Sequence, residues 1–189
     1  HKLARAILLC NDAKLEKSDD GWSVKGDPTE GALVVLAEKT SFQQDHVRKL
    51  YPRVGEVPFS SERKRMTTIH AKPDGLRACY MKGAPEVVLD HCNHICIEGR
   101  AREIQDEDRK HILKINEEMA GDGLRVLGVA ERELPAEVSV LNEENVERNL
   151  VFLGLVGMID PPREEAVEAV QVAKQVYMTP IMITGDHKL

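Results

Sequence analysis

The sequence has few aromatic residues and no long apolar segment. Aromatic residues make up 4% of the 189 residues, with one Trp and three Phe, so a ligand that stacks on a ring has few candidates. The longest apolar run, LVFLGLVGMI from Leu150 to Ile159, is about half as long as the roughly 20 residues of a membrane-spanning helix. With 42% hydrophobic and 31% charged residues, the sequence predicts a globular domain without a membrane-spanning helix.

An excess of basic charge is also missing. The formal net charge is −6 and the isoelectric point is near 5.7, which argues against a general affinity for the phosphate backbone of nucleic acids. The basic run Arg63-Lys64-Arg65 is too short to form a nucleic-acid patch in an acidic chain. We therefore expect no nucleic-acid partner.

Cysteines are few and lack the dense spacing of a disulfide scaffold, which favours a reducing compartment. The four of them are Cys10, Cys79, Cys92 and Cys96. One short segment, HCNHIC, could in principle face a metal ion with His91, Cys92, His94 and Cys96. Zinc sites usually use two separated ligand pairs, and a second pair is missing here. We expect no stoichiometric zinc, and a non-catalytic regulatory or metal-binding module using this cluster remains the alternative function.

Local patterns in the first half of the chain predict a helix and a hairpin. In KGDPTEGALVVLAEKT, Asp27 is expected to cap a helix that begins at Pro28, and Glu30 falls three residues after the cap, as in a capping box. In MTTIHAKPDGLRACYMK, two alternating runs are joined by Pro73-Asp74-Gly75, which predicts a β-hairpin.

The second half of the chain alternates between helical and strand-like segments. IQDEDRKHILKINEEMAGDG predicts an amphipathic helix with Ile112, Ile115 and Met119 on one face. LRVLGVAERE and LVFLGLVGMI predict strands, and GMIDPPREEAVEAVQVAKQ followed by PIMITGD outlines a β-α-β unit. Composition and periodicity thus indicate a mixture of helices and strands.

Six motifs occur in an order that resembles the P-type ATPases, cation pumps that pass through a phosphorylated aspartate. The motifs are KGDPTEGAL, VPFSSERKRM, MKGAPE, GLRVLGVA, GMIDPPR and MITGD. The chain is similar to the bacterial and archaeal pumps of the sarcoplasmic reticulum calcium pump group. The resemblance implies an α+β fold, a mainly antiparallel sheet flanked by helices, in a nucleotide-binding domain at residues 1–158. It implies a hinge and a partial β-α-β segment of the phosphorylation domain at residues 159–189.

The resemblance also implies a binding site for the adenine base. Lys82 lines the adenine pocket in this implied role, Lys64 lies near the adenine, and Glu30 contacts its amino group, although the capping box remains open for Glu30. Phe59 follows Pro58, and a ring at a strand end can stack on a purine, with core packing as the alternative. The implied nucleotide-binding residues are Glu30, Phe59, Lys64, Met66, Lys82, Gly83, Arg125 and Leu127.

The resemblance also implies roles for other residues of this set and for the binding of phosphate. The resemblance implies that Arg125 reaches the phosphates or ribose and that Leu127, on the same strand face, packs against the base. Gly83 lets a ligand approach the backbone, because no Cβ stands in the way. Animal calcium pumps commonly have an arginine where this chain has Ser61, so Arg63 is the substitute candidate for holding phosphate.

The phosphorylated aspartate of the family lies in Asp-Lys-Thr-Gly, which does not occur in these 189 residues. We therefore expect a fragment that binds ATP without turnover, in which no catalytic residue is present. The same absence argues against a self-sufficient phosphatase of the haloacid-dehalogenase type. The loop implied to meet phosphate in the intact pump is Thr184, Gly185 and Asp186, and the implied hinge is Asp160, Pro161, Pro162 and Arg163.

The resemblance further implies what the intact protein does. It would use ATP and Mg²⁺, lie with this domain at the cytoplasmic face of a membrane, and deliver the γ-phosphate to the aspartate of the neighbouring phosphorylation domain to drive ion transport. Its partners are adenine nucleotide and the phosphorylation, actuator and membrane domains of the same polypeptide. Resemblance favours calcium as the ion. Residues 159–189 are expected either to support a non-physiological dimer, because exposed strand edges recruit other chains, or to be the most mobile part of the chain.

Overall fold

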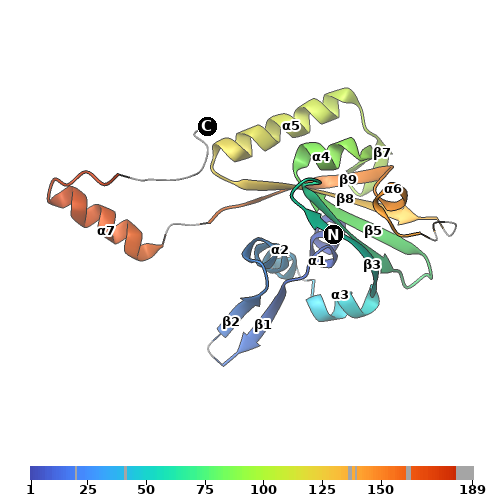
Figure 1. Cartoon of the computed structure of the whole chain (residues 1–189), viewed down its shortest axis with the longest axis horizontal. Helices are drawn as coiled ribbons and strands as arrows, with labels where there is room; N and C mark the ends of the chain where they lie inside the picture. Colours follow the sequence, from blue (N-terminus) through green and yellow to red (C-terminus); the bar gives the residue numbers. More distant parts are fainter. Residues whose placement is uncertain (20, 41, 136–137, 139, 161–162, 182–189) are drawn as a thin grey trace. The chain divides into compact units, whose positions relative to one another are not determined.

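The structure, a computed structural model, describes all residues except 20, 41, 136–137, 139, 161–162 and 182–189 (Figure 1). The chain divides into two units, His1–Met158 and Ile159–Leu189. Within the described part, no helix is both long enough and apolar enough to cross a bilayer.

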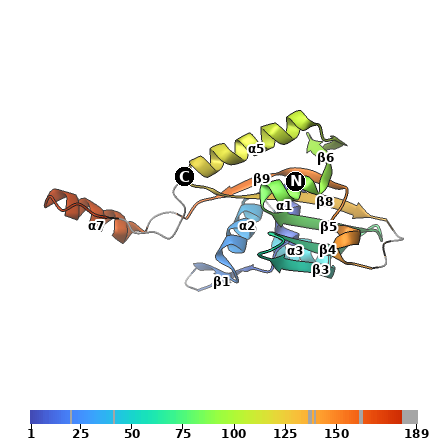
Figure 2. The same ribbon diagram turned by 45° about the horizontal axis from the view of Figure 1, so that its top comes forward.

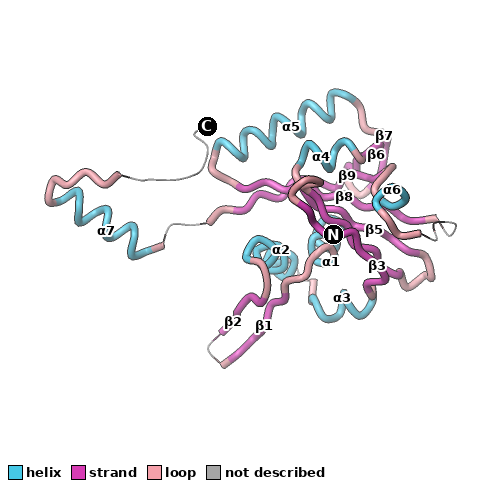
Figure 3. Tube along the Cα trace, viewed as in Figure 1, coloured by secondary structure: helices cyan, strands magenta, loops and turns pink. Residues whose placement is uncertain are grey.

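The first unit is built on a mainly antiparallel sheet. In the described residues it has seven strands in the order β3-β4-β5-β8-β9-β6-β7, and the β6–β9 pair is parallel while the other neighbours are antiparallel. The strands are β3 (Arg53–Ser60), β4 (Arg65–Ala71), β5 (Arg77–Gly83), β6 (Cys92–Ile97), β7 (Arg100–Glu103), β8 (Arg125–Leu134) and β9 (Leu150–Met158). Figure 3 shows β1 (Lys14–Ser18) and β2 (Gly21–Lys25) as a separate hairpin.

Helices cover both faces of the sheet (Figure 2). One face carries α1 (Lys2–Leu9), α2 (Pro28–Lys39) and α3 (Gln44–Leu50), and the other carries α4 (Pro85–Asp90), α5 (Asp106–Gly121) and the short α6 (Glu143–Val146). Strand β5 contributes to both cores, because successive side chains point to opposite faces. Tyr80 packs with α1 and α2, whereas Met81 packs with α4 and α5. The predicted α+β fold with an antiparallel sheet flanked by helices is confirmed.

Several local predictions are also confirmed. The predicted hairpin is β4 and β5, paired with Met66 opposite Lys82. The amphipathic helix is α5, in which Ile112 is buried. The cap of α2 forms as expected, since the Asp27 carboxylate accepts hydrogen bonds from the backbone N–H groups of Thr29 and Glu30 at 2.8 and 3.1 Å.

The β-α-β unit expected from Gly157 onward lies partly outside the described residues. Its first strand, β9, pairs antiparallel with β8 along its length and contributes Phe152 and Val156 to the two cores. It is therefore an inner strand of the first unit rather than an uncovered strand of the second. The second unit contains α7 (Glu164–Gln175), and most of the expected second strand lies outside the described residues.

Gly83 has a packing role that the sequence did not indicate, beside its expected role at the ligand site. A Cβ at this position would collide with the carbonyl oxygen of Lys64 and lie 2.8 Å from the Cα of Arg65. The amide of Ala84, the next residue, donates a hydrogen bond to the same Lys64 oxygen at 3.0 Å. Gly83 therefore permits the backbones of β4 and β5 to approach each other, and this contact excludes a side chain at the position.

His70 is a buried imidazole on β4. Its Nδ1 lies 2.8 Å from the carbonyl oxygen of Tyr51 and therefore donates to it, while Nε2 lies 3.0 Å from the hydroxyl of Thr68. Burial lowers the pKa of His70 to about 4; the bond to Tyr51 opposes this shift, and the charge of Arg53 adds to it. The folded domain therefore favours the neutral imidazole.

We expect Gly83→Ala to destabilise the domain. The added methyl group must force the β4 backbone away, and overpacking of this kind costs about 1–3 kcal/mol. Gly121→Ala is the matched control, because a Cβ there meets no atom within 4 Å and alanine favours the helix. Urea unfolding of both variants measures the difference. Equal free energies of unfolding for the two variants would contradict the close-approach explanation.

We also expect acid to weaken the fold through His70. Because its pKa is lower in the folded state, the unfolded chain binds more protons between about pH 6.5 and pH 4. The stability conferred by the neutral imidazole is complete above about pH 6.5 and is lost as the pH falls toward 4. From pH 7 to pH 5, the free energy of unfolding should fall by about 2 kcal/mol more in the unsubstituted chain than in His70→Gln. Urea titrations at the two pH values that give the same fall for both proteins would overturn this expectation.

Candidate functional site

One edge of the sheet brings together segments that are far apart in the sequence. Because β3, β4, β5 and β8 are successive antiparallel neighbours, the end of β3, the start of β4, the end of β5 and the start of β8 meet there. Met66 stands opposite Lys82, and Gly83 stands opposite Gly128. The first turn of α2 reaches the same edge through an ion pair between Glu30 and Lys82.

A pocket of about 610 Å³ lies at this edge. Its volume falls within the range of about 300–1,000 Å³ that is usual for small-molecule sites. The eight residues grouped by the sequence, from Glu30 to Leu127, all line it. Residues that the sequence did not assign to the site also line it, and they are Asp27, Thr29, Ala84, Pro85, Glu86 and Val126. Thr29 and Pro85 sit beside predicted site residues inside the motifs, which is the signal that could have identified them.

Lys82 lines this pocket as a buried cation. Its cross-strand partners Met66 and Val129 belong to the core under α1 and α2, so its side chain points to the same face as α2. The Nζ atom lies 2.6 Å from Oε1 of Glu30, and 9% of the lysine side chain is exposed. Removing one partner from such a buried pair would leave an uncompensated buried charge, which is costly. The two groups are therefore held together in a fixed mutual orientation.

Glu30 does not complete a capping box. Its Oε2 atom accepts hydrogen bonds from the backbone N–H groups of Asp12 and Ala13 at 2.9 and 3.2 Å, and Oε1 accepts from Lys82. The charge of Lys82 and the two amides in the loop after α1 satisfy this carboxylate in place of the cap. The capping-box hypothesis was therefore wrong for Glu30, although it was right for Asp27.

The rim of the pocket combines an aromatic ring with a guanidinium group. Phe59 is 61% exposed, so core packing, the alternative explanation for this ring, is wrong. Arg125 is exposed at the start of β8 and donates a hydrogen bond to the hydroxyl of Thr29 at 3.3 Å. Leu127 is partly buried against the same core as Met66. The flat ring of Phe59, the apolar side chains of Met66 and Leu127, and the nearby cations suit a planar ligand that carries negative charge.

Of the three consecutive cations at the β3–β4 turn, Lys64 lines the pocket, whereas Arg63 and Arg65 do not. Among the described residues that line the pocket, neither Ser61 nor Arg63 is present. Arg63 pairs with Glu147 and Glu143 and donates to the carbonyl oxygen of Pro58 at 2.8 Å. The idea that Arg63 replaces a phosphate-binding arginine is not supported, because Arg63 does not line the pocket and its guanidinium is paired with Glu143 and Glu147.

The histidine and cysteine cluster has no metal-binding geometry. Across the residues that the structure describes, no group of three or more His, Cys, Asp or Glu side chains converges. The thiol of Cys92 is buried and donates to the carbonyl oxygen of Val88 at 3.1 Å, and burial raises its pKa to about 12. A thiol with such a pKa is a poor source of the thiolate that zinc requires.

The remaining predicted residues belong to the second unit. Asp160 and Arg163 of the expected hinge are exposed. The two hinge prolines, and the expected phosphate loop at 184–186, lie outside the described residues.

Comparisons with known proteins agree with this architecture. A family model described as P-type ATPase, cytoplasmic domain N, matches residues 1–165. The chain is 41% identical to the cation-transporting ATPase pma1 of Synechocystis over 95% of its length. It is 38% identical to calcium-transporting ATPase 1 of Bacillus cereus over 98%, and 37% identical to the calcium-transporting ATPase of Bacillus subtilis over 99%.

The chain covers 19%, 20% and 21% of these three proteins, and thus spans about a fifth of the length of the relatives it matches. The family model covers most of the chain, including the whole sheet and the pocket. The chain therefore belongs to the P-type cation-transporting ATPases and corresponds to their cytoplasmic domain N.

Proposed function

We propose that the pocket binds adenine nucleotide, and that in the intact protein this domain presents the γ-phosphate of ATP to an aspartate of the phosphorylation domain. The observation that carries the proposal is that the eight residues implied by the family resemblance all line one pocket of about 610 Å³. They come from α2 and from β3, β4, β5 and β8, or from the turn between β3 and β4.

The chemistry of the pocket fits an adenine base. The exposed ring of Phe59 offers a face for stacking, an interaction worth about 1–3 kcal/mol per base in nucleic-acid binders. The carboxylate of Glu30 accepts hydrogen bonds, and the exocyclic amino group of adenine is a hydrogen-bond donor that it could accept from. Met66 and Leu127 supply apolar surface to the same pocket.

The phosphates would meet few cations on this domain. Lys64, Lys82 and Arg125 are the Lys and Arg side chains among the described residues that line the pocket, and Lys82 is already paired with Glu30. In phosphoryl transfer, Mg²⁺ supplies neutralisation of the phosphate charge. The described residues contain no convergent metal ligands, so Mg²⁺ would be held by ATP and by groups beyond them. We therefore expect weak binding, with a Kd near about 1 mM and little dependence on Mg²⁺.

The role of this domain in the intact protein is to hold and orient the nucleotide. Transfer of the γ-phosphoryl group would break its bond to ADP and form a bond to the aspartate carboxylate of the partner domain. We place this domain at the cytoplasmic face of a membrane, joined to the actuator and membrane domains, where the transfer drives cation transport. Calcium is the ion we favour, because it appears in the names of several relatives.

Phe59→Ala should weaken ATP binding by at least about fivefold, the effect of losing a stacking interaction worth about 1 kcal/mol. Because the ring is exposed, the substitution should leave the fold intact. Trp22→Ala is the matched control, since Trp22 is 65% exposed and does not line the pocket. Equilibrium dialysis with ATP measures both affinities. Equal affinities for Phe59→Ala and the unsubstituted chain would refute the assigned pocket.

Shortening the chain to residues 1–160 should leave the ATP affinity unchanged, because every residue that lines the pocket lies in the first unit. Neither form should hydrolyse ATP above the uncatalysed rate. The dimer through residues 159–189 remains a prediction, and sedimentation should detect it in the full chain alone. A large loss of affinity on shortening would show that the nucleotide site extends beyond the first unit.

A further inference from the structure

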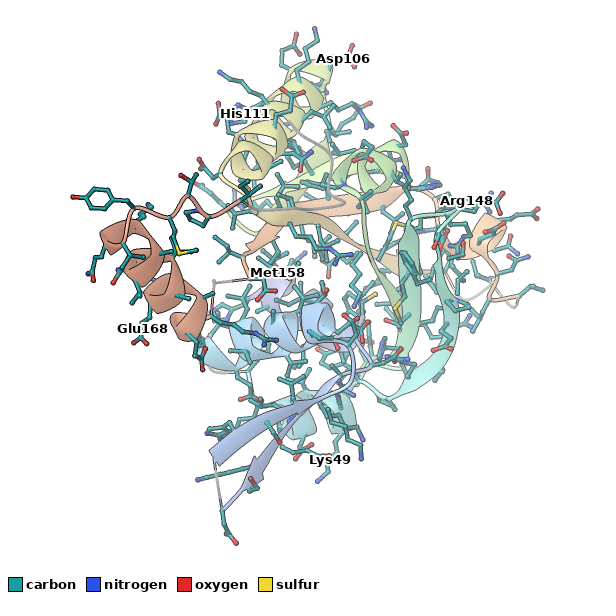
Figure 4. All side chains as sticks on the ribbon, turned by 60° about the vertical axis from the view of Figure 1, so that its left-hand side comes forward. Lys49, Asp106, His111, Arg148, Met158 and Glu168 are labelled. Carbon is teal, nitrogen blue, oxygen red and sulfur yellow. The ribbon has the colours of Figure 1, made fainter. Side chains whose placement is uncertain are left out.

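Glu147 is a buried carboxylate outside the proposed nucleotide site. It directly follows α6, and 1% of its side chain is exposed. Figure 4 labels the next residue, Arg148, which is exposed beside α6. A buried carboxylate is rare unless it is paired, so the partners of Glu147 show what it does.

Glu147 binds three residues of one short segment. Its Oε1 atom accepts from the guanidinium of Arg63 and, at 2.7 Å, from the hydroxyl of Thr67. Its Oε2 atom accepts from Nε of Arg65 at 2.7 Å. Burial acts to raise the pKa of Glu147, but the hydrogen bonds from Arg63, Thr67 and Arg65 outweigh it and hold that pKa below its ordinary value. The group is therefore an anion that bridges two cations separated by one residue.

The residue between these cations is Lys64, which lines the pocket. Its φ angle is +51°, in the left-handed region that residues other than glycine rarely adopt. Such a conformation persists only where the surroundings determine it. The Lys64 amide donates to the carbonyl oxygen of Ser60 at 2.8 Å, and the Lys64 carbonyl accepts from Ala84. The two neighbouring side chains are tied to Glu147.

We propose that Glu147 is a positioning residue of the nucleotide site, which holds Arg63 and Arg65 on one side of the turn and thereby fixes Lys64 in its left-handed conformation at the pocket. The inference rests on the proposed function, because it assigns Lys64 a ligand. It also explains why a turn with three consecutive cations presents one of them: the carboxylate engages the two arginines, and the lysine between them remains available to an anionic ligand.

Charge is essential to this role. Hydrogen bonds between guanidinium and carboxylate are stronger than those between neutral groups, and a glutamine has one acceptor oxygen where the carboxylate has two. Glu147→Gln therefore keeps the shape but releases at least one arginine. Preorganised binding groups lose affinity when they must be ordered by the ligand itself. We expect ATP to bind about fivefold more weakly to Glu147→Gln than to the unsubstituted chain.

Glu131→Gln is the matched control. Glu131 is also a mostly buried carboxylate with two cationic partners, Lys2 at 3.0 Å and Arg5 at 3.3 Å, but it does not line the pocket. Glu131→Gln removes the same charge as Glu147→Gln, so an effect of net charge or of general destabilisation would appear in both variants. We expect its ATP affinity to equal that of the unsubstituted chain. Equal losses of affinity in the two variants would overturn the proposal.

A double substitution separates positioning from a general structural role. Lys64→Ala alone should weaken ATP binding, and adding Glu147→Gln should then cause no further loss, because Glu147 acts through Lys64. A second fivefold loss in the Lys64→Ala background would refute this coupling.

Hydrogen exchange without nucleotide provides a readout that does not depend on ATP binding. The amide of Ala84 should exchange faster in Glu147→Gln, because its acceptor is the Lys64 carbonyl, and should be unaffected in Glu131→Gln. An unchanged rate in Glu147→Gln would overturn the positioning role. If the unsubstituted chain fails to bind ATP, the proposed function fails, and the Ala84 amide still decides whether Glu147 fixes the turn.

Discussion

The ion pair between Lys82 and Glu30 connects the parts of this domain that form its pocket. The lysine lies one residue before the end of β5, and the glutamate lies in the first turn of α2. The second oxygen of the glutamate binds the loop that follows α1. A buried pair adds little net stability compared with apolar residues, but it is costly to break on one side. Its main effect is therefore geometric, because it holds the start of α2 over the edge where four strands meet.

The position of the pocket follows from the burial of the sheet. Helices on both faces leave the central strands with apolar side chains on either side, as Tyr80 and Met81 show. Ligand-binding groups are consequently confined to the edge where the strands end. There, close backbone approach at Gly83 and the anion of Glu147 fix the β3–β4 turn from two directions, and one cation of the turn faces the pocket.

Local interactions in this fold were predictable from the sequence, and long-range ones were not. The cap at Asp27 and the β4–β5 hairpin depend on neighbouring residues, so their patterns were sufficient. The eight pocket residues came from a family resemblance, since nothing local connects Phe59 with Arg125. The bonds of Glu147 with Arg63 and Arg65 join residues more than 80 positions apart, and no spacing rule reveals them. Apolar runs show burial but not the partner strand, which is why the sequence did not reveal that β9 pairs with β8 and β6.

The central claim is that an adenine base stacks on Phe59 beside Glu30 and Lys82. The most direct measurement is intermolecular nuclear Overhauser spectroscopy of the isotope-labelled chain with ATP. The account predicts cross-peaks between the H2 or H8 proton of adenine and the ring protons of Phe59, with further contacts to Met66 and Leu127. Cross-peaks from adenine to residues outside this pocket, with none to Phe59, would contradict it.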